Sequence, residues 1–157
     1  MNIFVLSLCP KQCAKFTNDK HVVKMILESA QMLCTTHHLC CINPDSNIYK
    51  IAHKNHPCTI WTRETKANYS WLYLLFRELC KEYTYRYLKI HKCETKLMNI
   101  LNNIPELIPE GNMTIFKQAM PDDVKHKNPI IAYRQYYKKY KKSFCIWSKR
   151  SIPYWFD

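Results

Sequence analysis

Four polar side chains lie at helical spacing in an otherwise apolar stretch, and their types could support acid–base chemistry. They are His21, Lys24, Glu28 and Gln31, spaced three, four and three residues apart. In an α-helix this spacing puts all four on the same side. Their neighbours are apolar, namely Val22, Val23, Ile26, Leu27, Ala30 and Leu33, so most of this helix should face a core.

Charged groups on such a helix need a physical explanation. A buried carboxylate and a buried ammonium are costly unless they pair with each other or face a cleft. The pattern therefore predicts that this helix face borders a pocket. The alternative is a weak Lys24–Glu28 ion pair on a solvated face, which is common in helices.

A second candidate feature is the basic, aromatic end of the chain. Residues 124–156 contain no aspartate or glutamate but nine cations, which are Lys125, Lys127, Arg134, Lys138, Lys139, Lys141, Lys142, Lys149 and Arg150. Aromatic residues lie between them. Lysines neutralise phosphates and aromatic faces stack on bases, so this composition predicts a nucleic-acid-binding surface. The alternative, aromatic core residues beneath solvated lysines, suits Tyr133, Tyr137 and Tyr140, which share a helical face.

Cysteine and histidine are concentrated near residue 40, where a zinc site is one interpretation. Cys34, His37, Cys40 and Cys41 are close in sequence, and the segment HKNHPC (residues 53–58) offers further ligands. Structural zinc normally uses two separated pairs of ligands, and these residues form one group at a helix end. Free cysteines acting as small hydrophobic residues are the simpler interpretation, and we expect no metal and no cofactor.

Composition limits the fold class. The chain has 157 residues, 47% of them apolar and only one of them glycine, which favours one all-α domain over residues 1–157. No apolar run is long enough to cross a membrane, and MNIFVLSLCP lacks the basic start of a secretory signal. We therefore expect an intracellular protein with reduced thiols and no membrane partner. The net charge of +12 indicates a polyanionic partner.

The sequence predicts roughly five helices after a short extended segment, residues 1–7. Residues 10–16 can form one or two helical turns, and Asn18 or Asp19 should cap a long helix that ends near Cys40. Residues 59–89 predict one long helix, or two with a bend near Asn68. A short helix follows near residues 94–102. The last helix should begin at Asn128-Pro129 and continue to about Lys142.

Five stretches carry a resemblance to a known family: NDKHVVKMILESAQML, NHPCTIWTRETKANYSWLY, EYTYRYLKIHK, QAMPDD and AYRQYYKKYKKSFCIWSKRSIPYWF. Together they resemble small proteins of bacteriophages and large DNA viruses that are described as pyrimidine-dimer DNA glycosylase-like. That description comes from similarity to a phage ultraviolet-repair enzyme, endonuclease V. The resemblance to the viral group covers nearly the whole chain. The resemblance to the repair enzyme rests on the Asp19–His21–Glu28 spacing and the basic, tyrosine-rich end.

The resemblance implies an all-α glycosylase with coupled lyase chemistry. In the family an amine attacks the sugar C1′ to form a Schiff base, and a glutamate assists proton transfer. Glu28 matches that glutamate, with His21 beside it. Arg63, Glu64 and Asn68 could line the same pocket, or form an ordinary exposed helical turn. Substrate-binding groups would then be Gln31, Arg63, Asn68, Arg134, Lys138, Lys141, Lys142, Lys149 and Arg150.

The chain departs from the family pattern at the nucleophile. The repair enzyme uses the α-amine of a small residue exposed after methionine removal, whereas Asn2 is too bulky for efficient removal of Met1. The α-amine of Met1 could serve, or Lys24 with its pKa lowered by burial, or no such chemistry occurs. Two further departures are Ser7, where an aspartate is common, and Leu88, where a glycine is common.

Three functions remain at this point. The first is a base-excision enzyme, a glycosylase with abasic-site lyase activity on damaged or modified pyrimidines in double-stranded DNA. The second is a non-enzymatic viral DNA-binding or packaging protein, and the third is an enzyme of free nucleotides. For either DNA-acting protein the expected location is the host cytoplasm or nucleus, including a viral factory, or the virion.

Overall fold

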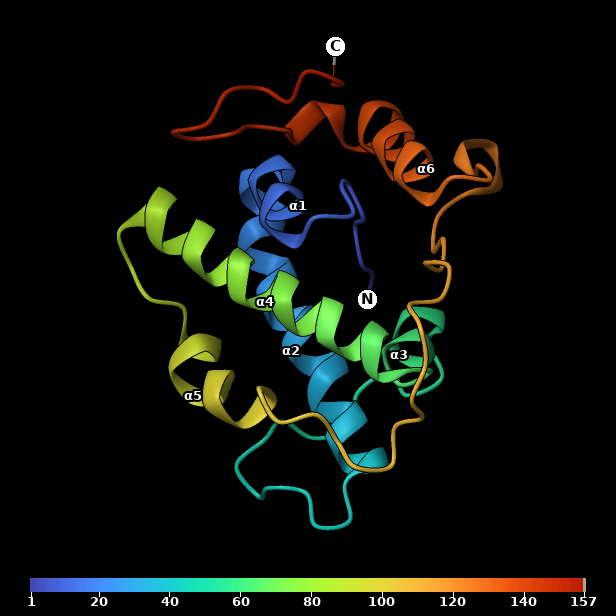
Figure 1. Ribbon diagram of the computed structural model, residues 1–157. Coiled ribbons are helices and arrows are strands. Elements are labelled where there is room, and N and C mark those ends of the chain that lie inside the picture. Colours follow the sequence, from blue (N-terminus) through green and yellow to red (C-terminus); the bar gives the residue numbers. More distant parts are fainter. Residues whose placement is uncertain (157) are drawn as a thin grey trace.

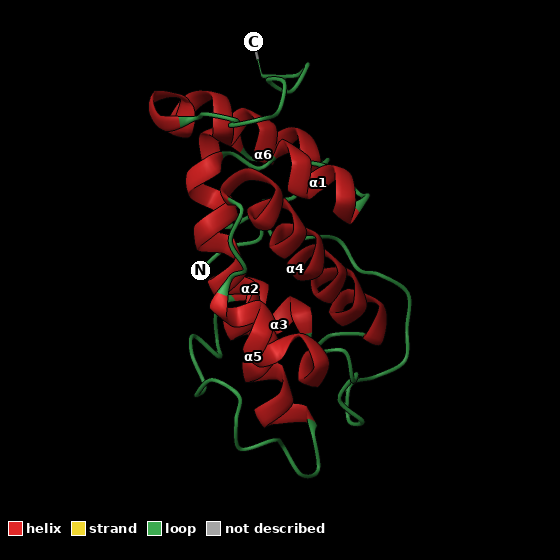
Figure 2. Cartoon of the chain, turned by 90° about the vertical axis from the view of Figure 1, so that its left-hand side faces the viewer, coloured by secondary structure: helices red, strands yellow, loops and turns green. Residues whose placement is uncertain are grey.

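The computed structural model describes residues 1–156, and within that range helices joined by loops are its only regular elements, with no strands (Figures 1 and 2). The α-helices are α1 (Pro10–Phe16), α2 (Asp19–Cys40), α3 (Pro57–Thr62), α4 (Lys66–Tyr87), α5 (Lys92–Leu101) and α6 (Pro129–Tyr136). Short 3₁₀ turns cover Asp122–Val124 and Lys142–Phe144, with a π-helical turn over Tyr137–Lys141 between α6 and the second of them. The all-α prediction is confirmed. The predicted domain end, Asp157, lies outside the described residues.

Local capping signals explain where α1 and α2 begin. Pro10 opens α1, and the side chain of Asn18 accepts a hydrogen bond of 3.0 Å from the His21 backbone N–H at the start of α2. The predicted cap and the predicted end at Cys40 are confirmed. The apolar surface of α2 is narrower than predicted, because Val23 and Leu27 are about 40% exposed.

Helices α2 and α4 cross at the centre of the molecule, with α1 packed against α4 (Figure 1). Large side chains from α2, α3 and α4, including Leu33, Trp61 and Phe76, are fully buried between the helices. Of the two arrangements predicted for residues 59–89, one long helix or two helices, the structure has two. They separate at residues 63–65, just before Asn68, where the Thr65 hydroxyl caps α4 by accepting from the Asn68 backbone N–H.

The last helix begins as predicted, with Asn128 as the cap and Pro129 at the first position. It does not continue as an α-helix to Lys142, because it changes to a π-helical turn at Tyr137. Tyr133 and Tyr137 are fully buried, whereas Tyr140 is 42% exposed. The wider i→i+5 turn rotates Tyr140 away from the core, so its predicted place in the core is wrong.

An ion-pair network attaches the C-terminal segment to the helices. The fully buried Arg86 guanidinium donates to Glu82 at 2.9 Å and to Asp19 at 2.8 Å, and Arg150 makes two further bonds to Glu82. Ser148 binds Asp19 through its hydroxyl and its backbone N–H. The two arginines hold the pKa of Glu82 below its usual range, although burial alone would raise it.

Leu88 ends α4 in a conformation that favours glycine. Its φ and ψ are 55° and 33°, the left-handed region, and its side chain is 79% exposed. We expect Leu88→Gly to stabilise the fold by about 0.5–1 kcal/mol, because it removes the strain of a Cβ and loses little packing. Denaturant unfolding would measure this gain. Leu88→Ala, which keeps the Cβ, should show no gain, and equal stability of the two variants would contradict the explanation.

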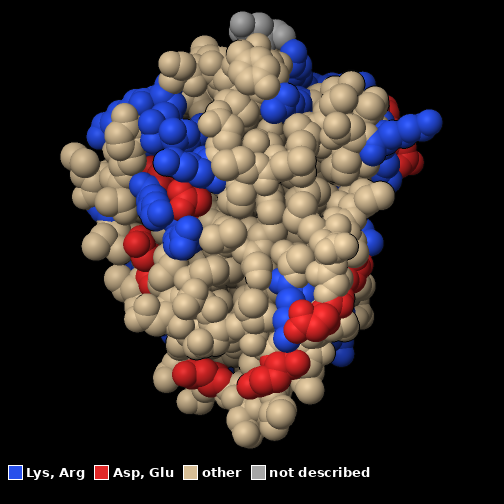
Figure 3. Space-filling view, viewed as in Figure 1, with Lys and Arg blue, Asp and Glu red and all other residues tan. Residues whose placement is uncertain are grey.

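Charge is unevenly distributed on the face seen in Figure 3. Lysine and arginine side chains gather at the upper end, where Figure 1 shows α1 and the C-terminal segment, and acidic side chains are more frequent below. No helix within residues 1–156 is both long and apolar enough to span a bilayer.

Candidate active site

The first six residues form an extended segment that is packed into the molecule. Ile3, Phe4, Val5 and Leu6 are buried. The Phe4 ring stacks on His21 with centroids 4.3 Å apart. The Arg134 guanidinium donates two hydrogen bonds, of 3.1 and 2.9 Å, to the Leu6 carbonyl. These contacts hold the chain end beside the middle of α2, where Figures 1 and 2 both show it.

This placement brings the α-amine of Met1 to the carboxylate of Glu28. The amine nitrogen lies 3.5 Å from Glu28 Oε2, and the same oxygen accepts a 2.9 Å hydrogen bond from the Asn2 backbone N–H. Oε1 lies 3.4 Å from Lys24 Nζ. Glu28 is only 8% exposed, so its charge is balanced mainly by these groups. A carboxylate in this position can exchange protons with the amine and stabilise a cation formed on it.

The four polar side chains that were predicted to share one side of α2 have different surroundings. Glu28 and His21 are buried, Gln31 is half-buried, and the Lys24 side chain is 67% exposed. The expectation that Lys24 is buried is therefore wrong. Burial was the predicted reason for Lys24 to act as a nucleophile, and that reason is removed. Lys24 forms an i,i+4 ion pair with Glu28 on the solvent side of the carboxylate.

His21 faces the aromatic core and does not contact Glu28 in this arrangement. Its Nδ1 lies 2.7 Å from the Tyr137 hydroxyl, and its ring contacts Phe4 and Phe144. Burial lowers the pKa of His21 to about 4, and the charges of Lys141 and Lys24 act in the same direction. The imidazole is therefore neutral at neutral pH, which suits a packing role better than that of an acid.

This lowered pKa predicts acid sensitivity of the fold. Between about pH 6.5 and pH 4 the unfolded chain binds a proton at His21 that the folded chain does not, so stability falls as the pH falls. Burial lowers the pKa of His37, His56 and His91 as well, with the same sign. The His21 contribution should be on the order of 1–3 kcal/mol. Urea midpoints between pH 7.5 and 5 would measure it, and His21→Gln should flatten the dependence.

The exposed His126→Gln should leave the dependence unchanged, and a profile for His21→Gln as steep as wild type would contradict the assignment.

Three residues near the amine were not selected from the sequence. The Asn2 side chain bonds the Tyr133 hydroxyl at 2.8 Å, and His56 caps α3 close by. The pKa of His56 is lowered by burial and by the positive α-amine of Met1. The sequence indicates His56 only as a source of metal ligands, Tyr133 only as a core aromatic residue and Asn2 only as a barrier to removal of Met1, and no local pattern brings the three together.

Arg63, Glu64 and Asn68 were predicted to line the site, but in the structure they bind other parts of the chain. Asn68 is fully buried and binds the Trp61 carbonyl, the Thr114 hydroxyl and the Thr114 backbone N–H. Arg63 donates to the Thr59 carbonyl one turn earlier, and Glu64 accepts from the Thr114 hydroxyl. Asn68 and Glu64 therefore hold the segment around residue 114, which corrects the expectation that Asn68 contacts substrate.

The predicted DNA-binding cations also fall into two groups. Arg134 binds Leu6, Arg150 binds Glu82 and stacks on Tyr85 at 4.0 Å, and Lys149 donates to the Tyr85 carbonyl. These three residues hold the chain together. Lys138 and Lys142 are exposed, and Lys141 is half-buried.

Exposed and half-buried aromatic rings lie under lysines next to this segment. Lys141 Nζ lies 4.8 Å from the Tyr136 ring centroid, and Lys20 Nζ lies 5.0 Å from that of Phe144. We call the group formed by Lys20, Tyr136, Lys139, Tyr140, Lys141 and Phe144 the cation–aromatic surface. It adjoins the N-terminal segment through Phe4, whose ring stacks on Tyr136 at 6.0 Å.

A family model described as pyrimidine dimer DNA glycosylase matches residues 1–95, which is more than half of the chain. The chain belongs to this glycosylase family. No curated protein and no solved structure matches it. The matched part contains Met1, Glu28 and α1–α4, whereas most of the cation–aromatic surface lies beyond it.

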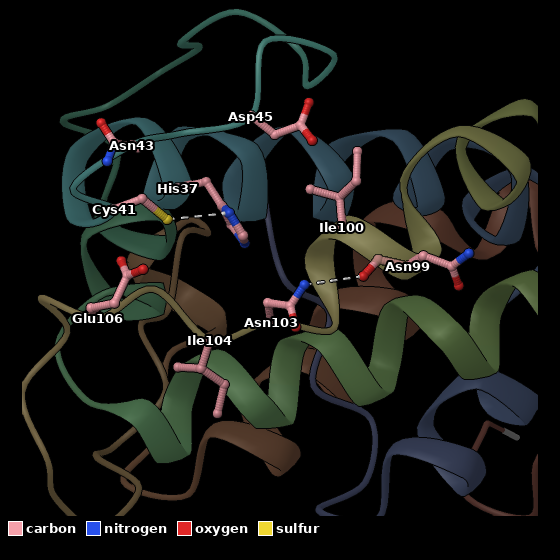
Figure 4. A pocket seen from close by; sticks show the side chains of 9 residues that line it. All are labelled: His37, Cys41, Asn43, Asp45, Asn99, Ile100, Asn103, Ile104 and Glu106. Carbon is pink, nitrogen blue, oxygen red and sulfur yellow. Dashed lines mark hydrogen bonds between the residues drawn. The ribbon is translucent and has the colours of Figure 1, made fainter.

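One hollow of this glycosylase family member lies at the C-terminal end of α2 and is lined by neither Met1 nor Glu28. A pocket of about 430 Å³ is lined by His37, Cys41, Asn43, Asp45, Asn99, Ile100, Asn103, Ile104 and Glu106 (Figure 4). His37 Nδ1 lies 3.4 Å from Cys41 Sγ, and its Nε2 lies 2.6 Å from the Tyr69 hydroxyl. Burial raises the pKa of Cys41 to about 11, so the thiol is protonated and unreactive. Within residues 1–156 no three histidine, cysteine or acidic side chains form a group that could hold a metal.

Proposed function

We propose that this protein is a DNA glycosylase with abasic-site lyase activity on damaged or modified pyrimidines in double-stranded DNA. The observation that carries the proposal is the 3.5 Å contact between the Met1 α-amine and Glu28 Oε2 in a largely buried setting. Membership of the glycosylase family supports the reaction class. The motif resemblance supports a viral or phage member of that family, acting within an infected cell.

The proposed reaction begins with attack of the unprotonated α-amine on the sugar C1′. The bond from C1′ to the base breaks, and the base leaves with the bonding electrons and takes a proton. Opening of the sugar ring then gives an iminium between C1′ and the amine nitrogen. The Glu28 carboxylate stabilises this cation and exchanges protons with the reacting groups. Loss of a C2′ proton expels the 3′ phosphate, and water releases the sugar fragment from the amine.

The α-amine is a better nucleophile candidate than Lys24. As a class, α-amines are weaker bases than lysine side chains, so a larger fraction is unprotonated at neutral pH. The Met1 amine is held by a packed segment, whereas Lys24 is largely in solvent. A fixed amine loses little freedom on reaching the sugar, which favours attack.

The cation–aromatic surface supplies the second requirement, a binding site for DNA. Lys20 and Lys141 can neutralise phosphates and the aromatic rings can stack on unpaired bases, whereas Lys139 is already paired with Asp123. Contacts from Tyr136 to Phe4 and from Phe144 to His21 place this surface next to the N-terminal segment. A bound duplex could therefore contact these residues while one nucleotide reaches the amine.

Borohydride trapping tests the proposal directly. The protein, with its mature N-terminus checked by intact mass, is mixed with duplexes that carry a pyrimidine dimer, an abasic site or a modified pyrimidine. We expect a covalent adduct and strand cleavage on the abasic duplex and on at least one base lesion. Absence of both across the panel would remove the enzymatic proposal.

The cation–aromatic surface alone favours a second candidate, a non-enzymatic DNA-binding protein. Such a protein would bind damaged and undamaged duplex equally, with affinity that falls with salt by a log–log slope of about −0.9 per neutralised phosphate. The Met1–Glu28 pair has no role in that function. Binding without any adduct in the trapping experiment would favour it.

A further inference from the structure

The Asn2 side chain is fixed from two sides, directly after the residue that carries the amine. Its Nδ2 donates a 2.9 Å hydrogen bond to the Ala119 carbonyl. Its Oδ1 lies 2.8 Å from the Tyr133 hydroxyl and accepts a 2.8 Å bond from the Ile3 backbone N–H. Asn2 is 8% exposed, so water competes little for these bonds. The side chain of Asn2 is therefore locked in one orientation.

Tyr133 links this side chain to two other parts of the fold. It is fully buried on α6, and its hydroxyl lies 2.7 Å from the Lys117 carbonyl as well as near Asn2. Its ring meets that of Phe4 edge-on at 5.8 Å. The helix that carries Tyr133 leads within three residues to Tyr136, on the cation–aromatic surface. One hydroxyl thus joins the N-terminal segment to the helix beneath that surface.

We propose that Tyr133 and Asn2 are positioning residues. They hold the α-amine next to Glu28 and at the correct distance from bound DNA. This inference rests on the proposed function. Neither side chain needs to touch the substrate. The Asn2 backbone N–H binds Glu28 Oε2, so fixing the Asn2 side chain leaves only the bonds within Met1 free to rotate. A displacement of the amine by about 1 Å is enough to lower the rate of attack by about 10²-fold.

Tyr133→Phe removes the hydroxyl and keeps the ring, and Tyr137→Phe is its matched control. Tyr137 is also fully buried, and its hydroxyl bonds His21 instead of the N-terminal segment. Single-turnover cleavage of an abasic duplex is measured together with affinity for an uncleavable tetrahydrofuran duplex. We expect Tyr133→Phe to slow cleavage by about 30–100-fold with affinity within about threefold. Tyr137→Phe should lower the melting temperature similarly and change the rate less than about threefold.

Asn2→Asp provides a second variant, since aspartate is also too bulky for efficient removal of Met1. It keeps an acceptor for Tyr133 but loses the donor to Ala119, so we expect a rate between wild type and Tyr133→Phe. A wild-type rate in Tyr133→Phe, or equal slowing by Tyr133→Phe and Tyr137→Phe, would overturn the inference.

An activity-independent measurement separates this inference from the proposed function. Acetylation of the α-amine by limiting reagent is followed by mass spectrometry of the N-terminal peptide. We expect several-fold faster labelling in Tyr133→Phe than in wild type or Tyr137→Phe, because the released amine leaves Glu28. If wild type forms no DNA adduct but labelling responds in this way, the proposed function fails and the positioning role stands. Equal labelling in all three proteins would overturn the positioning role.

Discussion

Replacing Glu28 by glutamine is expected to lower the single-turnover rate of base release and strand cleavage by about 10²–10³-fold. Glutamine has nearly the same shape and can still accept the hydrogen bond from the Asn2 backbone N–H. It has no negative charge to stabilise the iminium and no basic oxygen to accept a proton. Affinity for an uncleavable duplex should stay within about threefold, because Glu28 is buried and does not belong to the cation–aromatic surface.

Glu78→Gln is a suitable control for this substitution. Glu78 also has lysine and arginine partners, Lys81 and Arg77, but it lies on α4 and makes no contact with the N-terminal segment. It should retain wild-type rates. A thermal melt of both variants checks that each is folded. Full activity in folded Glu28→Gln would exclude the carboxylate from the reaction.

Blocking the α-amine should have an equally large effect on adduct formation. Acetylation of Met1 converts the amine to an amide that cannot form an iminium. We expect borohydride trapping to fall by about 10³-fold or more, because the other amine beside this carboxylate, that of Lys24, is on a side chain that lies largely in solvent. DNA binding should persist. Gel analysis of trapped complexes with an abasic duplex measures both.

Monomethylation of the same amine is the matched control. A secondary amine of similar size still forms an iminium, so most of the trapping should return, which separates chemical blockage from crowding of the site. Lys24→Gln should also trap normally, since the Lys24 side chain is largely in solvent. Trapping that survives acetylation and disappears in Lys24→Gln would assign the nucleophile to Lys24.

Helix boundaries could be predicted where local chemistry determines them. Asn18 and Asn128 cap α2 and α6 through bonds to residues two or three positions away, so the signal lies within a short window. The change to a π-helical turn at Tyr137 has no such local signal, because the surrounding residues are all compatible with an α-helix. The sequence therefore predicts neither this turn nor the exposure of Tyr140.

The candidate site could be predicted only where its residues lie close together in the sequence. Glu28 stands out because a buried acid is rare on an apolar helix, whereas the Asn2–Tyr133 bond joins residues 131 positions apart. Arg134 looked like a DNA contact because it lies in a basic run, yet its guanidinium holds Leu6, 128 positions away. Spacing along one helix cannot distinguish a cation that binds phosphate from one that holds the chain.

Mapping the site of the borohydride-trapped adduct identifies the nucleophile. After nuclease and trypsin digestion, Met1 and Lys24 fall in different peptides, since trypsin cleaves after Lys11 and Lys20. We predict that the sugar remnant lies on the α-nitrogen of Met1, in the peptide of residues 1–11. A remnant on Lys24 or on any other lysine, with an unmodified N-terminal peptide, would show that the Met1 α-amine is not the nucleophile.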